Sequence, residues 1–120
     1  MALPTGRWTI DANGFRGHMD IAGVDGAGNL NANLTIDAPR VDQMDGFWDD
    51  VSKKITFIRI LDASNPSRNQ VYTGYYWNNS RESPTDLTHH LAGEFEAFQG
   101  TGAIASRVLY GWMAQITTVG

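Results

Sequence analysis

Glycine interrupts five apolar, aromatic-rich runs of this 120-residue chain. The glycines at the centres of these runs are Gly17, Gly46, Gly74, Gly93 and Gly111. Glycine weakens the interior of a strand, so repeated central glycines mark places where a sheet bends sharply or where a neighbouring ring lies over bare backbone. Both situations occur where a small barrel closes. The pattern therefore predicts a closed sheet with an interior in which a ligand could sit.

Apolar and polar residues alternate along most of the chain. Trp8, Ile10 and Ala12 alternate with polar neighbours, and residues 30–36 follow the same period of two. This period is typical of strands that bury one face. Clusters of turn-forming residues separate the apolar runs. We expect eight strands, near residues 7–12, 15–24, 29–37, 42–49, 53–61, 69–77, 88–98 and 107–117.

Short antiparallel strands joined by short loops form a meander. An eight-stranded meander closes most economically into an all-β, antiparallel up-and-down β-barrel, and a two-sheet sandwich is the competing geometry. A chain of 120 residues is expected to form one domain, residues 1–120, with a core of its own. The interior either is filled by side chains, which leaves a shallow end pocket, or encloses an apolar cavity.

Charge and composition argue against several classes of protein. Nine Lys and Arg against thirteen Asp and Glu give a net charge of −4, which argues against a broad surface for nucleic acid or anionic membranes. The chain has no cysteine and therefore neither a disulfide nor a thiol nucleophile. Its apolar runs are too short to span a bilayer, and the first residues have no apolar signal core. We expect a cytoplasmic protein or a module of a longer chain.

Several segments resemble the avidin and streptavidin family. The opening Gly-Arg-Trp-Thr-Ile-Asp of residues 6–11, followed by residues 18–24 and 28–34, is similar to the first three strands of that family. Residues 71–76 are similar to its sixth strand, and the strand around Gly111 is placed like its eighth. The Gly-x-Trp is shared by the wider calycin group, which includes the lipocalins. The resemblance therefore implies a streptavidin-like fold more than an activity.

The resemblance also implies structural roles for four residues. In such barrels a tryptophan, here Trp8, plugs one end, and an arginine of the last strand, here Arg107, lies over its ring in a cation–π contact. The same register points Gly74 and Gly111 inward. Their missing side chains would leave room for aromatic neighbours and Met113.

Biotin binding of the avidin type does not carry over residue by residue. The asparagine and the tyrosine that hydrogen-bond the ureido carbonyl in avidins fall on Ile10 and Leu34, and a polar residue that meets the ureido nitrogen falls on Met113. The tryptophan at the end of the fifth strand has no counterpart around Ile60 and Leu61. A buried ureido group without partners would cost several times about 1–3 kcal/mol. We therefore expect no tight biotin binding.

Two positions preserve parts of the avidin-like site. Tyr72 stands where that family has an aromatic pocket wall, and Gln70 stands at a hydroxyl-bearing position. With the other residues that this register brings to the ligand, the candidate ligand-binding residues are Ile10, Leu34, Gln70, Tyr72, Tyr76 and Met113. The inward-facing set as a whole is expected to be Trp8, Ile10, Met19, Ile21, Leu30, Leu34, Phe47, Tyr72, Tyr76, Leu109, Met113 and Gln115.

A second group of apolar residues faces outward in this register. The fifth strand is apolar on both faces, and the sixth and eighth strands place Val71, Tyr75, Trp77, Tyr110 and Trp112 outside. A contiguous apolar patch is unusual on a monomer, and aromatic rings are effective in subunit contacts. We therefore expect a homo-oligomer of two-fold symmetry, built on the fifth to eighth strands. A loop folded over this face is the alternative.

Catalytic motifs are weak. His18, His89 and His90 could join nearby carboxylates at a metal, but adjacent strand residues face opposite ways, so His89 and His90 would not share an ion. No serine has a nucleophile motif, and no phosphate-binding loop is present. We expect no metal and no cofactor, and whether the chain is an enzyme stays uncertain.

The first function that we expect is a non-catalytic binding protein, which holds a small apolar or aromatic ligand in or at the mouth of the barrel. The alternative is a surface recognition module. It would be either a sugar-binding protein that uses Trp77 with Asn78, Asn79 and Asp86, or a protein inhibitor that uses its loops. An enzyme ranks third.

Overall fold

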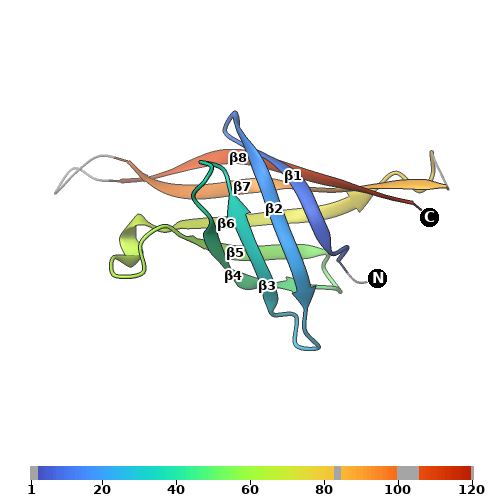
Figure 1. The fold of residues 1–120 in the computed structure, drawn as a ribbon, viewed down its shortest axis with the longest axis horizontal. Helices are drawn as coiled ribbons and strands as arrows, with labels where there is room; N and C mark the ends of the chain where they lie inside the picture. The colour runs from blue at the N-terminus through green and yellow to red at the C-terminus, as the bar shows by residue number, and fades with distance from the viewer. Residues whose placement is uncertain (1–2, 83–84, 100–105, 120) are drawn as a thin grey trace.

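The structure, a computed structural model, describes residues 3–82, 85–99 and 106–119. Eight antiparallel strands form a closed barrel in the order of the sequence (Figure 1). This confirms the predicted up-and-down barrel and excludes the sandwich. The elements are β1 (Gly6–Ala12), β2 (Phe15–Val24), β3 (Leu30–Thr35), β4 (Asp42–Asp49), β5 (Lys54–Ile60), the short 3₁₀ helix η1 (Pro66–Arg68), β6 (Gln70–Asn78), β7 (Asp86–Gln99) and β8 (Ser106–Val119).

The two ends of the barrel differ. At one end, which we call the mouth, β1, β3, β5 and β7 end, and the loops of residues 36–41 and 61–69 connect strands. At the opposite, closed end, Trp8 is fully buried, and its ring N–H donates to the Pro4 carbonyl oxygen at 3.0 Å. Leu3, in the segment before β1, is buried in the same core. Trp8 and Leu3 together close this end.

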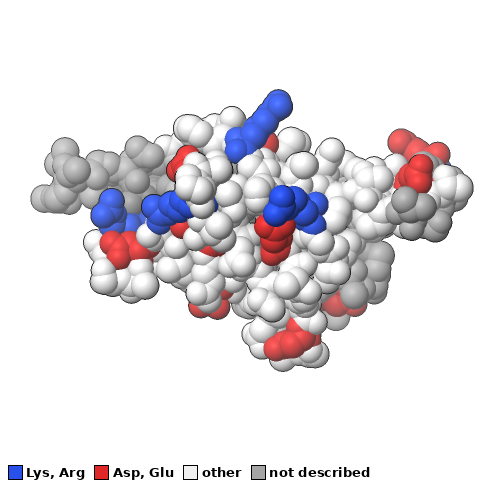
Figure 2. Space-filling view, viewed as in Figure 1, with Lys and Arg blue, Asp and Glu red and all other residues white. Residues whose placement is uncertain are grey.

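The hairpin of β7 and β8 is the longest part of the sheet and extends past the rest of the barrel wall (Figure 1). These strands pair at fourteen positions, whereas β1 and β8 pair at four. The molecule is therefore elongated, 52 × 30 × 29 Å, and is closed by a short seam. On the face in Figure 2, basic and acidic side chains of the described residues are scattered among uncharged ones, without a large area of one sign.

Aromatic rings fill the interior next to the mouth. Phe57, Tyr72 and Phe95 stack in a row, with ring centroids 4.7 Å apart at each step. Trp112 meets Phe57 and Tyr72 edge-on, at 5.8 and 5.7 Å. Such aromatic pairs contribute about 0.5–1.5 kcal/mol each beyond the burial of their area. All four rings are buried, so side chains occupy this part of the barrel and only its end is open to a ligand.

Three central glycines lie where a neighbouring strand passes close to bare backbone. A Cβ atom on Gly46 would stand 2.0 Å from the carbonyl oxygen of Thr56, and one on Gly93 would stand 2.0 Å from that of Thr73. Gly17 meets β3 in the same way. No side chain fits at such a distance, so these crossings require glycine. The approach of a neighbouring strand to bare backbone thus accounts for these three central glycines.

The remaining two central glycines, Gly74 and Gly111, differ from each other. Gly74 faces inward, and the indole of Trp112 lies over it, with an atom 2.6 Å from where a Cβ would stand. Gly111 is exposed, and the nearest atom to a Cβ there, the carbonyl oxygen of Gly93, is 4.0 Å away. The predicted inward position of Gly111 is therefore wrong.

The predicted facing of β8 is wrong by one residue along the strand. Leu109 and Met113 are 61% and 59% exposed, whereas Trp112 is buried and Tyr110 packs against the core. A shift of one residue moves every side chain to the other face. Residues 108–113 are apolar on both faces, so alternation alone did not decide between them. The residues predicted inside that are exposed are Phe47, Leu109, Met113 and Gln115.

Arg107 does not cover the ring of Trp8. Its Nε donates to Glu96 Oε1 at 2.6 Å, on the outside of the hairpin. β1 pairs with the far half of β8, where Thr9 lies opposite Gln115. Eight residues of extended strand separate Arg107 from Gln115, roughly 27 Å at about 3.4 Å per residue. The predicted cation–π contact is therefore wrong, because the two residues lie at different ends of the molecule.

Replacing Gly93 by alanine tests the role of these crossings. The new methyl group would collide with the Thr73 carbonyl oxygen, so we expect a loss of about 1–3 kcal/mol or more in the free energy of unfolding, measured with urea. The matched control is Gly111→Ala, which places its methyl group in open space and should change stability by less than about 0.5 kcal/mol. Equal losses in the two variants would contradict the structure.

Candidate functional site

The described surface has several hollows, among them a shallow one of about 380 Å³ beside Gly93 and Gly111 and three others. The mouth pocket, of about 220 Å³, opens at the end of the barrel. A closed-end pocket of about 480 Å³ lies at the opposite end, and an outer groove of about 460 Å³ crosses the outside of β1 and β8. The mouth pocket is lined by Ala12, Asn13, Phe15, Ile36, Asp37, Arg59, Gln70, Tyr72, Phe95, Ala97 and Tyr110.

A buried ion pair lies below the mouth pocket. Arg59 of β5 donates from Nε to Asp42 Oδ2 of β4 at 2.8 Å, and both side chains are less than a tenth exposed. Arg40, in the loop before β4, donates from Nε to the other Asp42 oxygen at 2.7 Å. Buried charges are tolerated where they are paired and hydrogen-bonded. Asp42 thus holds Arg59 in a fixed position at the end of the lumen.

Gln70 and Tyr72 extend this network across β6. Gln70 Oε1 accepts a hydrogen bond from Arg59 Nη1 at 3.2 Å and another from the Tyr72 hydroxyl at 2.9 Å. Burial raises the pKa of the Tyr72 phenol above its ordinary value of 10.0, and the charge of Arg59 opposes this rise. The hydroxyl therefore stays protonated at neutral pH and acts as a hydrogen-bond donor. The phenol of Tyr72 is fully buried and holds Gln70 in place, so the group of this network that reaches the pocket beside apolar walls is the guanidinium of Arg59.

The structure brings only two of the predicted ligand-binding residues to this pocket, Gln70 and Tyr72. Ile10 and Leu34 belong to the buried core, at 3% and 0% exposed. Tyr76 lies nearer the closed end, where its ring packs edge-on against Trp48. Met113 lies outside, along the outer groove.

Sequence reasoning missed Asp42 and Arg59. Their strands carry a signal, because the alternation that buries Met44 on β4 and Phe57 on β5 also turns Asp42 and Arg59 inward. Two opposite charges at inward positions near one end of neighbouring strands indicate an internal ion pair. The pairing itself became visible only with the register of β4 against β5, in which Gln43 lies opposite Ile60.

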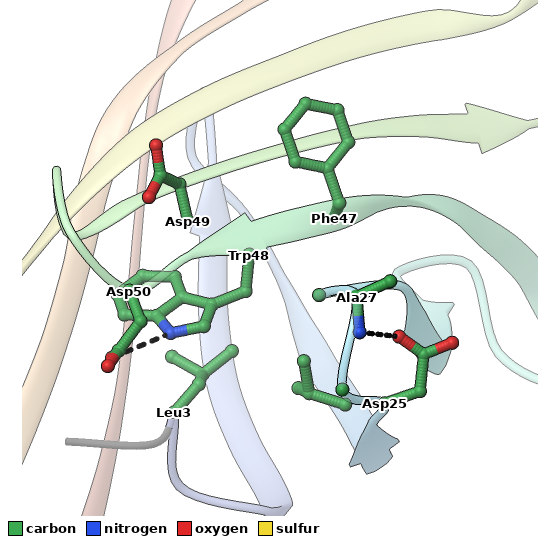
Figure 3. A pocket seen from close by; sticks show the side chains of 10 residues that line it. Leu3, Asp25, Ala27, Phe47, Trp48, Asp49 and Asp50 are labelled. Atoms are coloured by element: carbon green, nitrogen blue, oxygen red, sulfur yellow. Dashed lines mark hydrogen bonds between the residues drawn. The ribbon is translucent and has the colours of Figure 1, made fainter.

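Three carboxylates line the closed-end pocket (Figure 3). Each of them already accepts hydrogen bonds from residues of the turns around it. Hydrogen bonds lower the pKa of Asp25, above all those from Asn29, and backbone N–H groups of the following turn lower the pKa of Asp49. The Lys53 ammonium lowers the pKa of Asp50 in the same way. These carboxylates are ionised at neutral pH and bound to their own turns, so they shape the loops.

Phe47 and Trp48 leave opposite sides of β4 beside this pocket (Figure 3). Trp48 is 5% exposed and Phe47 is 51% exposed. The inward position predicted for Phe47 is therefore wrong. Its neighbours on the same face, Gln43, Asp45 and Asp49, are polar and exposed, so the alternation along β4 already favours Trp48 as the buried ring.

The outer groove combines an aromatic platform with polar groups. The ring of Trp77 stacks on that of His90, with centroids 4.9 Å apart and planes 12° from parallel. Thr9 and Gln115 line the groove beside them. We expected Asn78 to act with Trp77. Its side chain instead donates a hydrogen bond to the hydroxyl of Tyr76 at 3.0 Å, so these two adjacent residues have different contacts.

The adjacent histidines lie in different environments. His89 is buried, and its ring nitrogens contact the hydroxyls of Tyr76 at 2.6 Å and Thr118 at 2.9 Å. His90 faces the outer groove. Among the described residues, no cluster of three or more His, Cys, Asp and Glu side chains could hold a metal ion.

Comparison of the chain with protein-family models, with curated proteins and with solved structures found no match. The observed eight-stranded, antiparallel closed barrel is compatible with a streptavidin-like or calycin-like fold. In the part of the chain that the structure describes, no helix has the length and apolar character needed to cross a membrane.

Replacing His89 by glutamine tests the buried cluster of His89, Tyr76 and Thr118 through the pH dependence of stability. Burial, and then the neighbouring His90, lowers the pKa of His89 from its ordinary value of 6.5. The unfolded chain therefore binds a proton at a higher pH than the folded chain, and the free energy of unfolding should fall as the pH drops below about 6.5. In His89→Gln, the free energy of unfolding, measured with urea between pH 7.5 and 5, should decrease less than in the wild type. His18→Gln, at a half-exposed position away from the cluster, should show the same decrease as the wild type. An unchanged fall in His89→Gln would contradict the assignment.

Proposed function

We propose that this chain is a non-catalytic, streptavidin-like binding protein that holds a small apolar or aromatic ligand at the mouth of the barrel. The observation that carries the proposal is the buried network of Arg59, Gln70 and Tyr72 at the base of an open pocket with apolar walls. Ligand sites typically combine apolar and aromatic walls with a few fixed polar groups. The mouth pocket has this composition.

The volume of the mouth pocket limits the size of the ligand. At about 220 Å³, it exceeds the roughly 150 Å³ of a cavity that holds benzene. It is smaller than the roughly 300 Å³ at which pockets for drug-sized molecules begin. The pocket therefore suits a molecule with a single ring and one short substituent.

Biotin is not the ligand that this mouth suits. Ile10 and Leu34, which stand where avidins bind the ureido carbonyl, are buried in the core and have apolar side chains. The stacked rings of Phe57, Tyr72 and Phe95 occupy the depth that a bicyclic ligand would need. A ureido group there would lose its hydrogen bonds to water without replacing them.

Filling the mouth with a larger side chain tests the proposed site. Ala97 is 6% exposed and lines the pocket. Titration with benzyl alcohol, benzamide and benzoate, followed by NMR, should give saturable shifts at the mouth for at least one probe. Ala97→Leu should weaken that binding at least about tenfold, because its branched side chain takes part of the ring's volume.

The matched control is Ala27→Leu, which makes the same change at the rim of the closed-end pocket. It should leave the affinity unchanged. Equal affinities in wild type and Ala97→Leu, or shifts that map to the outer groove, would contradict the proposed site.

We also propose that the outer face of β5 to β8 forms a subunit contact. Large apolar side chains are exposed there, and exposed apolar patches commonly mark contacts between proteins. Tyr110 and Trp112, which we expected in this surface, lie inside, and Leu109 and Met113 take their place. The exposed apolar residues of these strands are Ile58, Tyr75, Trp77, Leu109 and Met113.

Light scattering tests the oligomer. We expect a mass of about twice the 13.2 kDa of one chain at micromolar concentration. A double change, Leu109→Lys with Met113→Lys, should give the mass of a single chain, because it places two ammonium groups in the contact. A mass near 13.2 kDa for the wild type would contradict this proposal.

A surface recognition module is the second candidate function, and the outer groove is the observation that favours it. Trp77 is 49% exposed and presents a ring face beside His90 and Gln115. A ring face with neighbouring hydrogen-bonding groups suits a sugar. Binding to no member of a glycan array would exclude this function.

A further inference from the structure

We infer that the ligand of the mouth pocket carries a carboxylate, which Arg59 binds through its free N–H groups, so that the preferred class is a one-ring aromatic carboxylate. This inference rests on the proposed function and adds the chemical group that the pocket selects. Its evidence is the balance of donors and acceptors below the mouth.

The side-chain oxygens around Arg59 that can accept hydrogen bonds already receive them. Gln70 Oε1 receives hydrogen bonds from both Arg59 and Tyr72. Since a guanidinium can only donate, the amide oxygen of Gln70 must be the atom that faces Arg59. Each carboxylate oxygen of Asp42 receives a guanidinium N–H, one from Arg40 and one from Arg59. A ligand would therefore find few acceptors here.

Arg59 has more N–H groups than it has hydrogen-bond acceptors around it. A guanidinium has five N–H groups, and within the described residues Arg59 makes two hydrogen bonds, one from Nε and one from Nη1. No fully buried side-chain nitrogen or oxygen of the described residues lacks a partner. Nη2 of Arg59, which makes neither of these hydrogen bonds, must therefore have accessible surface. Because Arg59 is 6% exposed and lines the mouth pocket, we place the N–H groups of Nη2 toward that pocket.

The charge of the cluster also favours an anion. Two guanidinium groups, of Arg40 and Arg59, share the carboxylate of Asp42. The charges of Asp37 and Asp62 also act on Arg40, whereas within the described residues Arg59 forms its ion pair with Asp42. Asp37 is a further carboxylate at the pocket, but it lies exposed at the rim, where water screens its charge. A ligand carboxylate would accept two N–H groups from the planar fork, the geometry in which such pairs are strongest.

Apolar walls complete the recognition of a ring. Phe95 and Tyr110 lie 5.3 Å apart between centroids and line the pocket together with Ile36. A ring packed against the pocket side of these side chains, with its carboxylate toward Arg59, would use both halves of the pocket. Benzoate is the simplest molecule of this class.

Titration of the wild-type chain with a matched pair of probes tests the inference. Benzoate and benzamide share size and ring, but only benzoate carries a charge and two equivalent acceptor oxygens. By NMR at pH 7, we expect benzoate to bind at least about tenfold more tightly, because its hydrogen bonds to Arg59 are charge-assisted. The Arg59 side-chain N–H resonances should shift on saturation with benzoate.

The outcomes separate this inference from the proposed function. Equal binding of both probes at the mouth would overturn the carboxylate inference and leave the proposed function standing. Binding of neither benzoate, benzamide nor benzyl alcohol would overturn both. Benzoate shifts that spare Arg59 would also overturn the inference.

A matched pair of variants locates the effect. Arg59→Lys keeps a positive charge beside Asp42 but removes the planar fork, so the preference for benzoate over benzamide should fall to less than about threefold. Arg40→Lys makes the same change on the other oxygen of Asp42, outside the pocket lining, and should keep the full preference. An unchanged preference in Arg59→Lys would overturn the inference. If that variant does not fold, the wild-type comparison and the Arg59 resonances decide it.

Discussion

Closure of this barrel relies on the close passage of one strand over a bare glycine of the next. At Gly17, Gly46 and Gly93, a carbonyl oxygen of the neighbouring strand lies 2.0 Å from where a Cβ would stand. Strands that approach one another this closely form a sheet that closes with four residue pairs between β1 and β8. Once it is closed, the alternation along each strand decides which side chains enter the lumen. The apolar core and the mouth pocket both follow from that geometry.

The ion pair of Asp42 and Arg59 is the exception in this apolar interior. Replacing a buried ion pair by apolar side chains of similar volume is often neutral or stabilising, so stability alone gives no reason for charges at these inward positions. The proposed ligand would give one. Asp42 and Gln70 fix Arg59 in the free protein, and such preorganisation lowers the entropy cost of binding. The stacked rings that fill the lumen would confine this ligand to the end of the barrel.

Much of the fold was predictable because period-two alternation and turn residues act locally. Every strand boundary lies within two residues of its expected position, and the order of the strands follows from short connections. The facing of β8 is ambiguous within residues 108–113, which are apolar on both faces, whereas the whole strand places Arg107, Gln115 and Thr117 on the face opposite Ala114 and Ile116. Of the residues that line the candidate pocket, Gln70 and Tyr72 were among those predicted to bind a ligand, whereas Arg59 was not. Its role depends on Asp42, a partner from another strand seventeen residues away.

Fold and proposed function meet at Arg59, which the closed barrel presents at the base of an open mouth pocket. An experimental structure of the wild-type protein crystallised with benzoate is the sharpest test. We expect an eight-stranded barrel with the benzoate ring packed against Phe95 and Tyr110 and its carboxylate within hydrogen-bond distance of the terminal nitrogens of Arg59. A mouth filled by its own side chains, with Arg59 enclosed and benzoate absent from it, would refute both the open pocket and the role of Arg59.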